Sequence, residues 1–223
     1  MKENVIFETQ DGSHSILSSQ FGVSYHSKYG AIQESKHVFI EAGLHRKALL
    51  QKKIAVLEIG FGTGLNAFLT LLAALEHQWQ ISYEGIEAYP VAVAQVAQLN
   101  YPTLLSADNR KPEFLQLHEV AWSREVSIHP LFSFIKQKMD FEDIRYDSQF
   151  DLVYFDAFAP DAQPQLWEAP LLSKVHAALK PQGILVTYCA KGAVKRVLRS
   201  VGFQVEALPG PPGKREMTRC LKL

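Results

Sequence analysis

The stretch that decides the fold reads VLEIGFGTGLN and covers residues 56–66. The largely aliphatic run at 54–59 is typical of a buried strand, and the apolar run at 65–75 predicts a helix that begins directly afterwards. Three glycines at alternate positions, Gly60, Gly62 and Gly64, connect the two. Glycine has no Cβ, and the first amides of a helix point outward. This strand, loop and helix therefore predict a seat for a nucleotide-like ligand.

The spacing of these glycines is Gly-x-Gly-x-Gly, which differs from the Gly-x-Gly-x-x-Gly fingerprint of dinucleotide-binding proteins. The spacing therefore favours S-adenosylmethionine over NAD as the ligand. The alternative interpretation is a plain tight turn between a strand and a helix, which the surrounding pattern disfavours.

Length and composition describe an ordinary globular chain. Its 223 residues suffice for one domain with a full core, or for a domain with an appendage. No run of about 18 apolar residues predicts a membrane span, and the N-terminus lacks the apolar core of a signal peptide. Cys189 and Cys220 are too few for a disulfide framework, and neither they nor the histidines show metal-ligand spacing. We expect a cytoplasmic protein with reduced thiols and no bound metal.

Charge is distributed unevenly, although the formal net charge is zero. Residues 139–170 hold eight acidic side chains and one basic side chain, whereas residues 180–223 hold nine basic and two acidic ones. Such asymmetry can mark a surface that faces a polyanion. It can equally reflect opposite charges that pair within the fold. Charge alone leaves both interpretations open.

The chain divides into an accessory segment, residues 1–50, and an alternating α/β region, residues 51–223. In the first, residues 5–9 and 14–17 predict a hairpin with Asp11-Gly12 as its turn, and residues 38–40 predict a short strand. In the second, alternating strands and helices predict a mostly parallel sheet, and two adjacent closing strands predict an antiparallel edge. Its expected strands cover residues 54–59, 81–86, 131–138, 150–155, 184–188, 203–208 and 217–223.

Four carboxylates lie within or just beyond the carboxyl ends of predicted strands, where open α/β sheets bind ligands. Glu87 can accept hydrogen bonds from both ribose hydroxyls of an adenosyl group, each worth roughly 1.5–3 kcal/mol. Asp140 can meet the adenine edge. Glu58 can orient the glycine loop or receive the methionine amino group, directly or through water. A strand-end cap or a surface charge is the alternative for each of them.

The fourth carboxylate, Asp156, is expected near the methyl group that is transferred. An alkylamine with a pKa of about 10.4 is almost wholly protonated at neutral pH, so freeing its lone pair costs roughly 4–5 kcal/mol. A nearby carboxylate can bind the ammonium, orient it and accept its proton. Phe158 and Trp167 can wall the pocket or stack on a base, and core packing is the alternative for both.

Taken together, the motifs resemble the methyltransferase domain of the bacterial MnmC family. The glycine loop alone indicates only class I methyltransferases, whereas residues 156–160 and 213–217 are more specific. Ala157 departs from the glycine of the family's Asp-Gly-Phe-Ala-Pro form. The matching stretches are residues 29–30, 34–39, 58–66, 87–90, 156–160, 163–164, 166–167 and 213–217.

The resemblance implies a Rossmann-like class I S-adenosylmethionine-dependent methyltransferase fold over residues 51–223. Its sheet would be mostly parallel and seven-stranded with an antiparallel last strand, and residues 1–50 would form a small β-rich extension. It also implies transfer of a methyl group to the 5-aminomethyl group of (2-thio)uridine at the tRNA wobble position. The cofactor would be S-adenosylmethionine, with no metal, no flavin, no membrane and no obligate protein partner. Two-domain family members carry a flavin-dependent oxidase after this domain, and we expect none here because the sequence stops at Leu223.

The same resemblance, together with the strand-end positions, assigns the site. The expected catalytic residue is Asp156. The expected cofactor residues are Glu58, Gly60, Phe61, Gly62, Thr63, Gly64, Asn66, Glu87 and Asp140, and the expected substrate residues are Tyr29, Phe158, Trp167, Lys214 and Arg215.

Three other functions are considered. The first is a class I methyltransferase that acts on a small-molecule or protein amine. The second is an NAD-binding oxidoreductase, which the glycine spacing and the antiparallel finish disfavour. The third is a catalytically silent RNA-binding module.

Overall fold

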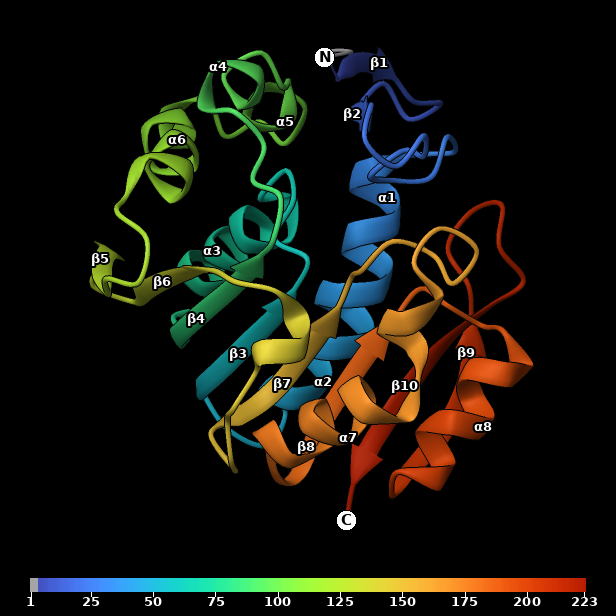
Figure 1. Cartoon of the computed structure of the whole chain (residues 1–223). Helices are drawn as coiled ribbons and strands as arrows, with labels where there is room; N and C mark the ends of the chain where they lie inside the picture. The colour runs from blue at the N-terminus through green and yellow to red at the C-terminus, as the bar shows by residue number, and fades with distance from the viewer. Residues whose placement is uncertain (1–3) are drawn as a thin grey trace.

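A mixed sheet of eight strands forms the centre of the computed structural model, which describes residues 4–223 (Figure 1). From one edge to the other the strands are β5 (Val126–His129), β6 (Phe132–Lys138), β4 (Gln80–Glu87), β3 (Lys53–Ile59), β7 (Phe150–Phe155), β8 (Leu179–Thr187), β10 (Glu216–Lys222) and β9 (Phe203–Pro209).

The five central strands from β6 to β8 are parallel, and β10 is antiparallel to both of its neighbours. This confirms the expected seven-stranded class I arrangement. The sheet also has an eighth strand at its edge, because β5 pairs with β6 in an antiparallel hairpin. The strand order reverses at β3, which has β4 on one side and β7 on the other. Such a switch point is where open α/β sheets form their ligand crevice.

Alternating residues of the central strands enter two separate cores. Val56 and Tyr154 face the core that holds α3 (Leu65–His77), whereas Leu57 and Phe155 face the core that holds α7 (Ala169–Ala178). Helix α8 (Gly192–Ser200) packs beside α7 (Figure 1). Burial on both faces explains why these strands read as nearly continuous apolar runs.

The segment before β3 contributes a long helical stretch to the α3 side of the sheet. It runs through α1 (Ala31–Ser35), the π-helical η1 (Lys36–His45) and α2 (Arg46–Ala48), and η1 contacts β7, β8 and α3. The prediction of a strand at residues 38–40 is therefore wrong. Val38, Phe39 and Ile40 are buried as helix residues, and a short apolar run looks the same in a buried helix as in a strand. The division of the chain at residue 50 stays a prediction.

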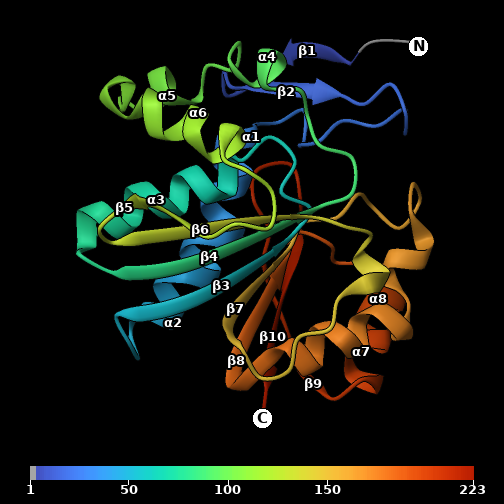
Figure 2. The same cartoon turned by 60° about the vertical axis from the view of Figure 1, so that its left-hand side comes forward.

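The predicted N-terminal hairpin is confirmed as β1 (Val5–Glu8) and β2 (His14–Leu17). It lies at the same end of the molecule as α4 (Val93–Val96), α5 (Tyr101–Leu104) and α6 (Lys111–Glu119), as both views show (Figure 2). Asn100 connects the two parts, since its side chain accepts from the His14 N–H at 2.8 Å and donates to the Gly12 carbonyl at 2.9 Å.

Among the helices described in residues 4–223, none is both long enough and apolar enough to cross a membrane.

Candidate active site

The loop between β3 and α3 turns on three glycines with positive φ: 92° at Gly60, 50° at Gly62 and 72° at Gly64. Side chains of L residues rarely adopt these values. The loop is also crowded. A Cβ on Gly60 would lie 2.6 Å from the backbone oxygen of Asp156, and one on Gly62 would lie 2.9 Å from the Tyr25 ring. Glycine is therefore required for both reasons, and the loop lies directly against the end of β7.

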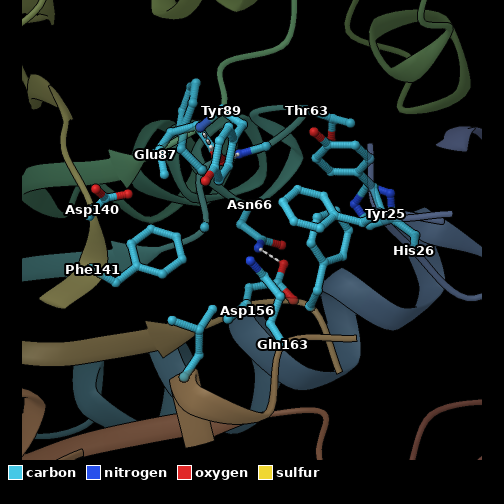
Figure 3. Close-up of a pocket in the computed structure, with 18 of the residues that line it drawn as sticks. Tyr25, His26, Thr63, Asn66, Glu87, Tyr89, Asp140, Phe141, Asp156 and Gln163 are labelled. Atoms are coloured by element: carbon cyan, nitrogen blue, oxygen red, sulfur yellow. Dashed lines mark hydrogen bonds between the residues drawn. The ribbon is translucent and has the colours of Figure 1, made fainter. Parts of the chain in front are cut away.

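A cavity opens beside this loop, at the carboxyl ends of β3, β4, β6 and β7 (Figure 3). Most of the residues expected at the site meet there, although they come from four separate strands and their loops. The expected residues that line this cavity, called the cofactor cavity below, are Gly60, Phe61, Gly62, Thr63, Asn66, Glu87, Asp140, Asp156 and Phe158.

Asn66 links two carboxylates at the floor of the cofactor cavity. Its Nδ2 donates to Glu58 Oε1 and to Asp156 Oδ2, both at 2.8 Å. The other Glu58 oxygen accepts from the Tyr83 hydroxyl at 2.7 Å, and burial raises the pKa of Glu58 well above its usual value. Glu58 is fully buried and does not line the cavity, so its contact with the cofactor's amino group stays a prediction. Its side chain orients Asn66.

Asn66 also provides an observation that points to a ligand. Its Oδ1 is buried and has no hydrogen-bond partner within residues 4–223, although the residue lines the cavity. A buried acceptor without a donor is costly in a folded protein, so such atoms generally have a partner. An ammonium group in the cavity would supply that donor. The methionine end of S-adenosylmethionine carries one, so the residues present fit this cofactor.

Asp156 follows β7 and is anchored by its N–H, which donates to the Ile59 carbonyl at 2.9 Å. Its half-buried carboxylate faces the cofactor cavity, hydrogen-bonded to Asn66 (Figure 3). Burial raises the pKa of Asp156 to about 7, and the charge of Glu34 adds to this rise. The Asn66 hydrogen bond and the charge of Lys214 act in the opposite direction. A carboxyl group with this pKa can exchange a proton at neutral pH.

Glu87 closes β4 on the far side of the cofactor cavity from Asp156 (Figure 3). Its Oε2 accepts from the Gly62 N–H at 2.8 Å and its Oε1 from the Tyr89 N–H at 2.9 Å. Each carboxylate oxygen can accept a second hydrogen bond, so these contacts are compatible with ribose binding. The exposed Asp140 stands beside Phe141 at the end of β6, compatible with a contact to the adenine edge. Both assignments stay predictions.

Trp167 does not line the cavity, and its role in substrate binding stays a prediction. Only 3% of the side chain is exposed, and its ring packs on Phe155 with centroids 4.9 Å apart. Its Nε1 donates to the Phe158 carbonyl at 2.8 Å. Trp167 therefore belongs to the core and supports the Phe158 loop from beneath.

Other expected residues lie outside the cofactor cavity. Gly64 shapes the loop from the start of α3 without lining the wall. Tyr29 packs against Gly213, where an added Cβ would lie 2.2 Å from its ring. Lys214 and Arg215 follow in that same loop between β9 and β10, and both line neighbouring surface rather than this cavity.

The sequence analysis missed an aromatic wall from the N-terminal segment. Phe21 and Tyr25 each pack on Phe158 with ring centroids 5.0 Å apart, and all three line the cofactor cavity. The aromatic and polar composition of residues 21–29 was the available signal. No spacing rule connects Phe21 and Tyr25 with Phe158, which lies more than 130 residues later.

Ion pairs account for much of the charge asymmetry. Five of the nine basic residues in residues 180–223 pair with carboxylates inside the fold: Lys180 with Asp151, Lys191 with Asp161, Lys195 with Glu216, Lys214 with Glu34 and Arg219 with Glu206. Within residues 4–223 no ion pair involves Arg196, Arg199 or Arg215, and all three are exposed. Pairing within the fold therefore engages five of the nine basic side chains, and three exposed arginines remain.

Comparisons with known proteins agree with this geometry. A family model described as S-adenosyl-L-methionine-dependent methyltransferase matches residues 112–222. The tRNA 5-methylaminomethyl-2-thiouridine biosynthesis bifunctional protein MnmC of Aromatoleum aromaticum is 29% identical over 223 residues, which cover 95% of this chain and 34% of that protein. The protein of the same name from Pseudomonas aeruginosa strain UCBPP-PA14 is 29% identical over 226 residues, covering 90% of this chain and 32% of that protein. The chain thus spans about a third of the length of these relatives.

Solved structures show the same fold. MNMC2 from Aquifex aeolicus superimposes with a TM-score of 0.78 at 24% identity, covering 99% of this chain and 70% of that one. Spermidine synthase from Thermotoga maritima gives a TM-score of 0.53 at 12% identity, covering 99% of this chain and 71% of that one. The chain belongs to the S-adenosyl-L-methionine-dependent methyltransferases and is related to the MnmC proteins, which confirms the family resemblance and the fold class. This finding decides against the NAD-binding oxidoreductase.

Proposed function

We propose that this methyltransferase acts on the 5-aminomethyl group of (2-thio)uridine at the tRNA wobble position, giving 5-methylaminomethyl-(2-thio)uridine. The observation that carries the proposal is Asp156, a carboxylate with a pKa of about 7 that faces a cavity beside the glycine loop. A proton acceptor is what an amine substrate needs before it can be methylated. The relatives are named for biosynthesis of 5-methylaminomethyl-2-thiouridine, which supports this choice of amine.

The residues of the cofactor cavity would hold S-adenosylmethionine, which supplies a methyl group on a positively charged sulfur. Glu87 would accept hydrogen bonds from the ribose hydroxyls, and Asp140 would contact the adenine. Asn66 would receive the methionine ammonium at its Oδ1. Gly60 and Gly62, which line the cavity without side chains, would let the cofactor approach the start of α3.

Asp156 takes a proton from the amine that accepts the methyl group. The substrate arrives as a primary ammonium, which the carboxylate binds and orients. Asp156 then accepts one proton and leaves a neutral amine with a lone pair. Bound S-adenosylmethionine would supply the methyl group to this nitrogen, and the product would be a secondary ammonium. Phe158, Tyr25 and Phe21 keep water away from this step.

Contacts to the RNA backbone would come from the exposed arginines, Arg196, Arg199 and Arg215. Phosphate contacts of this kind position an RNA without reading its sequence. Lys214 is engaged by Glu34, so its role differs from that of Arg215.

The proposal is tested by incubating the protein with radiolabelled S-adenosylmethionine and tRNA from cells that lack this activity. We expect label in tRNA and, after nucleoside analysis, in 5-methylaminomethyl-(2-thio)uridine. Label in another nucleoside, or none in tRNA, would contradict the proposal.

A methyltransferase that acts on a small-molecule or protein amine is the second candidate. The observation in its favour is the pairing of five basic residues, which leaves little positive surface for RNA. Binding of bulk tRNA separates the two. A tRNA enzyme should lose affinity steeply as salt increases, because phosphate contacts release counterions, whereas an enzyme for a small amine should not bind bulk tRNA.

A further inference from the structure

A second cavity adjoins the cofactor cavity. Tyr25, His26, Ala157 and Phe158 line both, so these residues form a common wall. The second cavity is bounded on its other sides by the N-terminal hairpin and by the loop that carries Lys214. Asp156 lines the cofactor cavity, on the other side of this common wall.

Lys214 lines this second cavity and brings an alkylammonium to its wall. Lys214 Nζ pairs with the Glu34 carboxylate and lies 4.2 Å from the centre of the Tyr188 ring. A carboxylate and an aromatic face are the two partners that attract an alkylammonium most strongly. The Tyr188 ring is held in place, since its hydroxyl donates to the Ala157 carbonyl at 2.8 Å.

Glu34 is held in place where it contacts the Lys214 ammonium. Its side chain is 9% exposed, and its Oε1 accepts from the Ser27 N–H at 3.3 Å. Its charge adds to the rise in the pKa of Asp156, which lines the cofactor cavity on the other side of the common wall. His26, in that wall, adds no positive charge at neutral pH, because burial lowers its pKa to about 4.

We propose that Glu34 is the second carboxylate of the acceptor site and binds the substrate's ammonium, which displaces the resident Lys214 ammonium from Glu34 and Tyr188. This inference rests on the proposed function and adds a residue to it. The acceptor would enter with its ammonium between Glu34 and Asp156, and Asp156 alone would take the proton. Glu34 therefore contributes to binding rather than to the chemical step. It selects a cationic amine over a neutral hydroxymethyl group of the same shape.

The test uses the full chain, S-adenosylmethionine and two synthetic anticodon stem-loops. One carries 5-aminomethyluridine at the wobble position and is the substrate, and the other carries 5-hydroxymethyluridine and is a competitor. For Glu34→Gln we expect KM for the aminomethyl RNA to rise roughly 10- to 100-fold, as for loss of a hydrogen bond to a charged group, with kcat changed less than about threefold. We also expect the variant to lose its preference for the aminomethyl RNA over the competitor.

Lys214→Met tests whether Glu34 binds the substrate directly or only holds Lys214 in place. If the substrate displaces Lys214, its removal should lower KM, and the double variant should keep the raised KM of Glu34→Gln. If Glu34 serves only to hold Lys214 against RNA, Lys214→Met should raise KM as much as Glu34→Gln does, and that result overturns the inference. The direction of the Lys214→Met change decides the matter even if Glu34→Gln does not fold. Glu41→Gln, an exposed change further along the same helical stretch, is the matched control and should leave KM unchanged.

Two failures are distinguishable in this experiment. A wild-type protein that does not methylate the aminomethyl RNA overturns both the proposed function and this inference. A wild-type protein that methylates it, together with a Glu34→Gln variant of unchanged KM, overturns the role of Glu34 alone.

Discussion

Asn66, at the start of α3, donates a 2.8 Å hydrogen bond from its Nδ2 to Oδ2 of Asp156, just beyond the end of β7. The same amide nitrogen donates to Glu58 on the adjacent strand, also at 2.8 Å. The bond to Asp156 favours the charged carboxylate and lowers its pKa, whereas burial raises it. The balance leaves a pKa of about 7, which makes Asp156 a proton acceptor at neutral pH.

Replacing this acceptor should abolish most turnover. Asp156→Asn keeps the shape of the side chain but cannot accept a proton, so we expect kcat to fall by roughly 10²–10⁴, the range for acid–base groups. Wild-type kcat/KM should rise with pH through about 7, because it reports the pKa of Asp156 in the free enzyme, and the variant should lack this rise. Methyl transfer across a pH series measures both, and calorimetry with S-adenosylmethionine is the control for cofactor binding. A catalytically silent RNA-binding module would lose no turnover.

Ionisation of Asp156 should also affect stability. Its pKa is about 7 in the folded protein and near 3.8 when unperturbed, so the folded state binds more protons between these values. Stability therefore falls as pH rises through this window and changes no further above it. Asp156→Asn cannot ionise, so it lacks this loss of stability. The Tm of the variant minus the Tm of wild type should therefore be larger at pH 8 than at pH 4. Thermal melts at both values test this, and an equal difference at both would contradict the raised pKa.

Alanine substitutions at Gly12 and Gly60 distinguish the cost of backbone strain from the cost of steric crowding. Gly12 and Gly60 have similar φ values, 81° and 92°, but an added Cβ meets nothing within 4 Å at Gly12 and lies 2.6 Å from the Asp156 oxygen at Gly60. Gly12→Ala should cost only the left-handed strain, about 1–2 kcal/mol. Gly60→Ala should cost more and should also weaken cofactor binding. Denaturant unfolding measures both, and equal losses would show that the loop can relax away from Asp156.

Loss of Glu87 should weaken cofactor binding. Glu87→Ala removes an acceptor for the ribose and frees the Gly62 N–H. We expect affinity for S-adenosylmethionine to fall roughly 10- to 100-fold, as for a hydrogen bond to a charged group, while the protein stays folded. Calorimetry is the measurement, and the exposed Glu119→Ala on α6 is the control. Unchanged affinity would remove Glu87 from the ribose site.

The exposed arginines should contribute to RNA binding. For Arg199→Ala combined with Arg215→Ala we expect weaker binding to all tRNAs, and a salt slope smaller by about 1 for each phosphate that the variant no longer binds. Arg124→Ala, which precedes β5 at the opposite edge of the sheet, should leave the slope unchanged. Binding isotherms at several salt concentrations test this. If the double variant binds like wild type, these two arginines do not face the RNA.

Much of the fold could be predicted because the signals are local. The aliphatic run before Gly60, the glycine spacing and the apolar helix after it each depend on neighbouring residues. The meeting of Glu87, Asp140 and Asp156 followed from one geometric rule, since the carboxyl ends of parallel strands share an edge. Residues 38–40 were misassigned because their apolar run has no period long enough to distinguish a helix from a strand.

Side chains brought together from distant loops could not be predicted in the same way. Trp167 was expected at the substrate and lies in the core, because composition does not tell which face of a loop is buried. Glu34 and Lys214, 180 residues apart, meet beside the common wall, and no local pattern relates them.

Local sequence patterns were thus enough to predict the sheet, the glycine loop and the row of carboxylates at the carboxyl edge of the sheet. Each of these depends on backbone geometry over a few residues. The packing of the whole chain was needed to bury Glu58 against Asn66, to pair five basic residues with carboxylates and to bring Glu34 to Lys214. Burial and electrostatic interaction act through space, so the proton affinity of Asp156 depends on residues that are far from it along the chain.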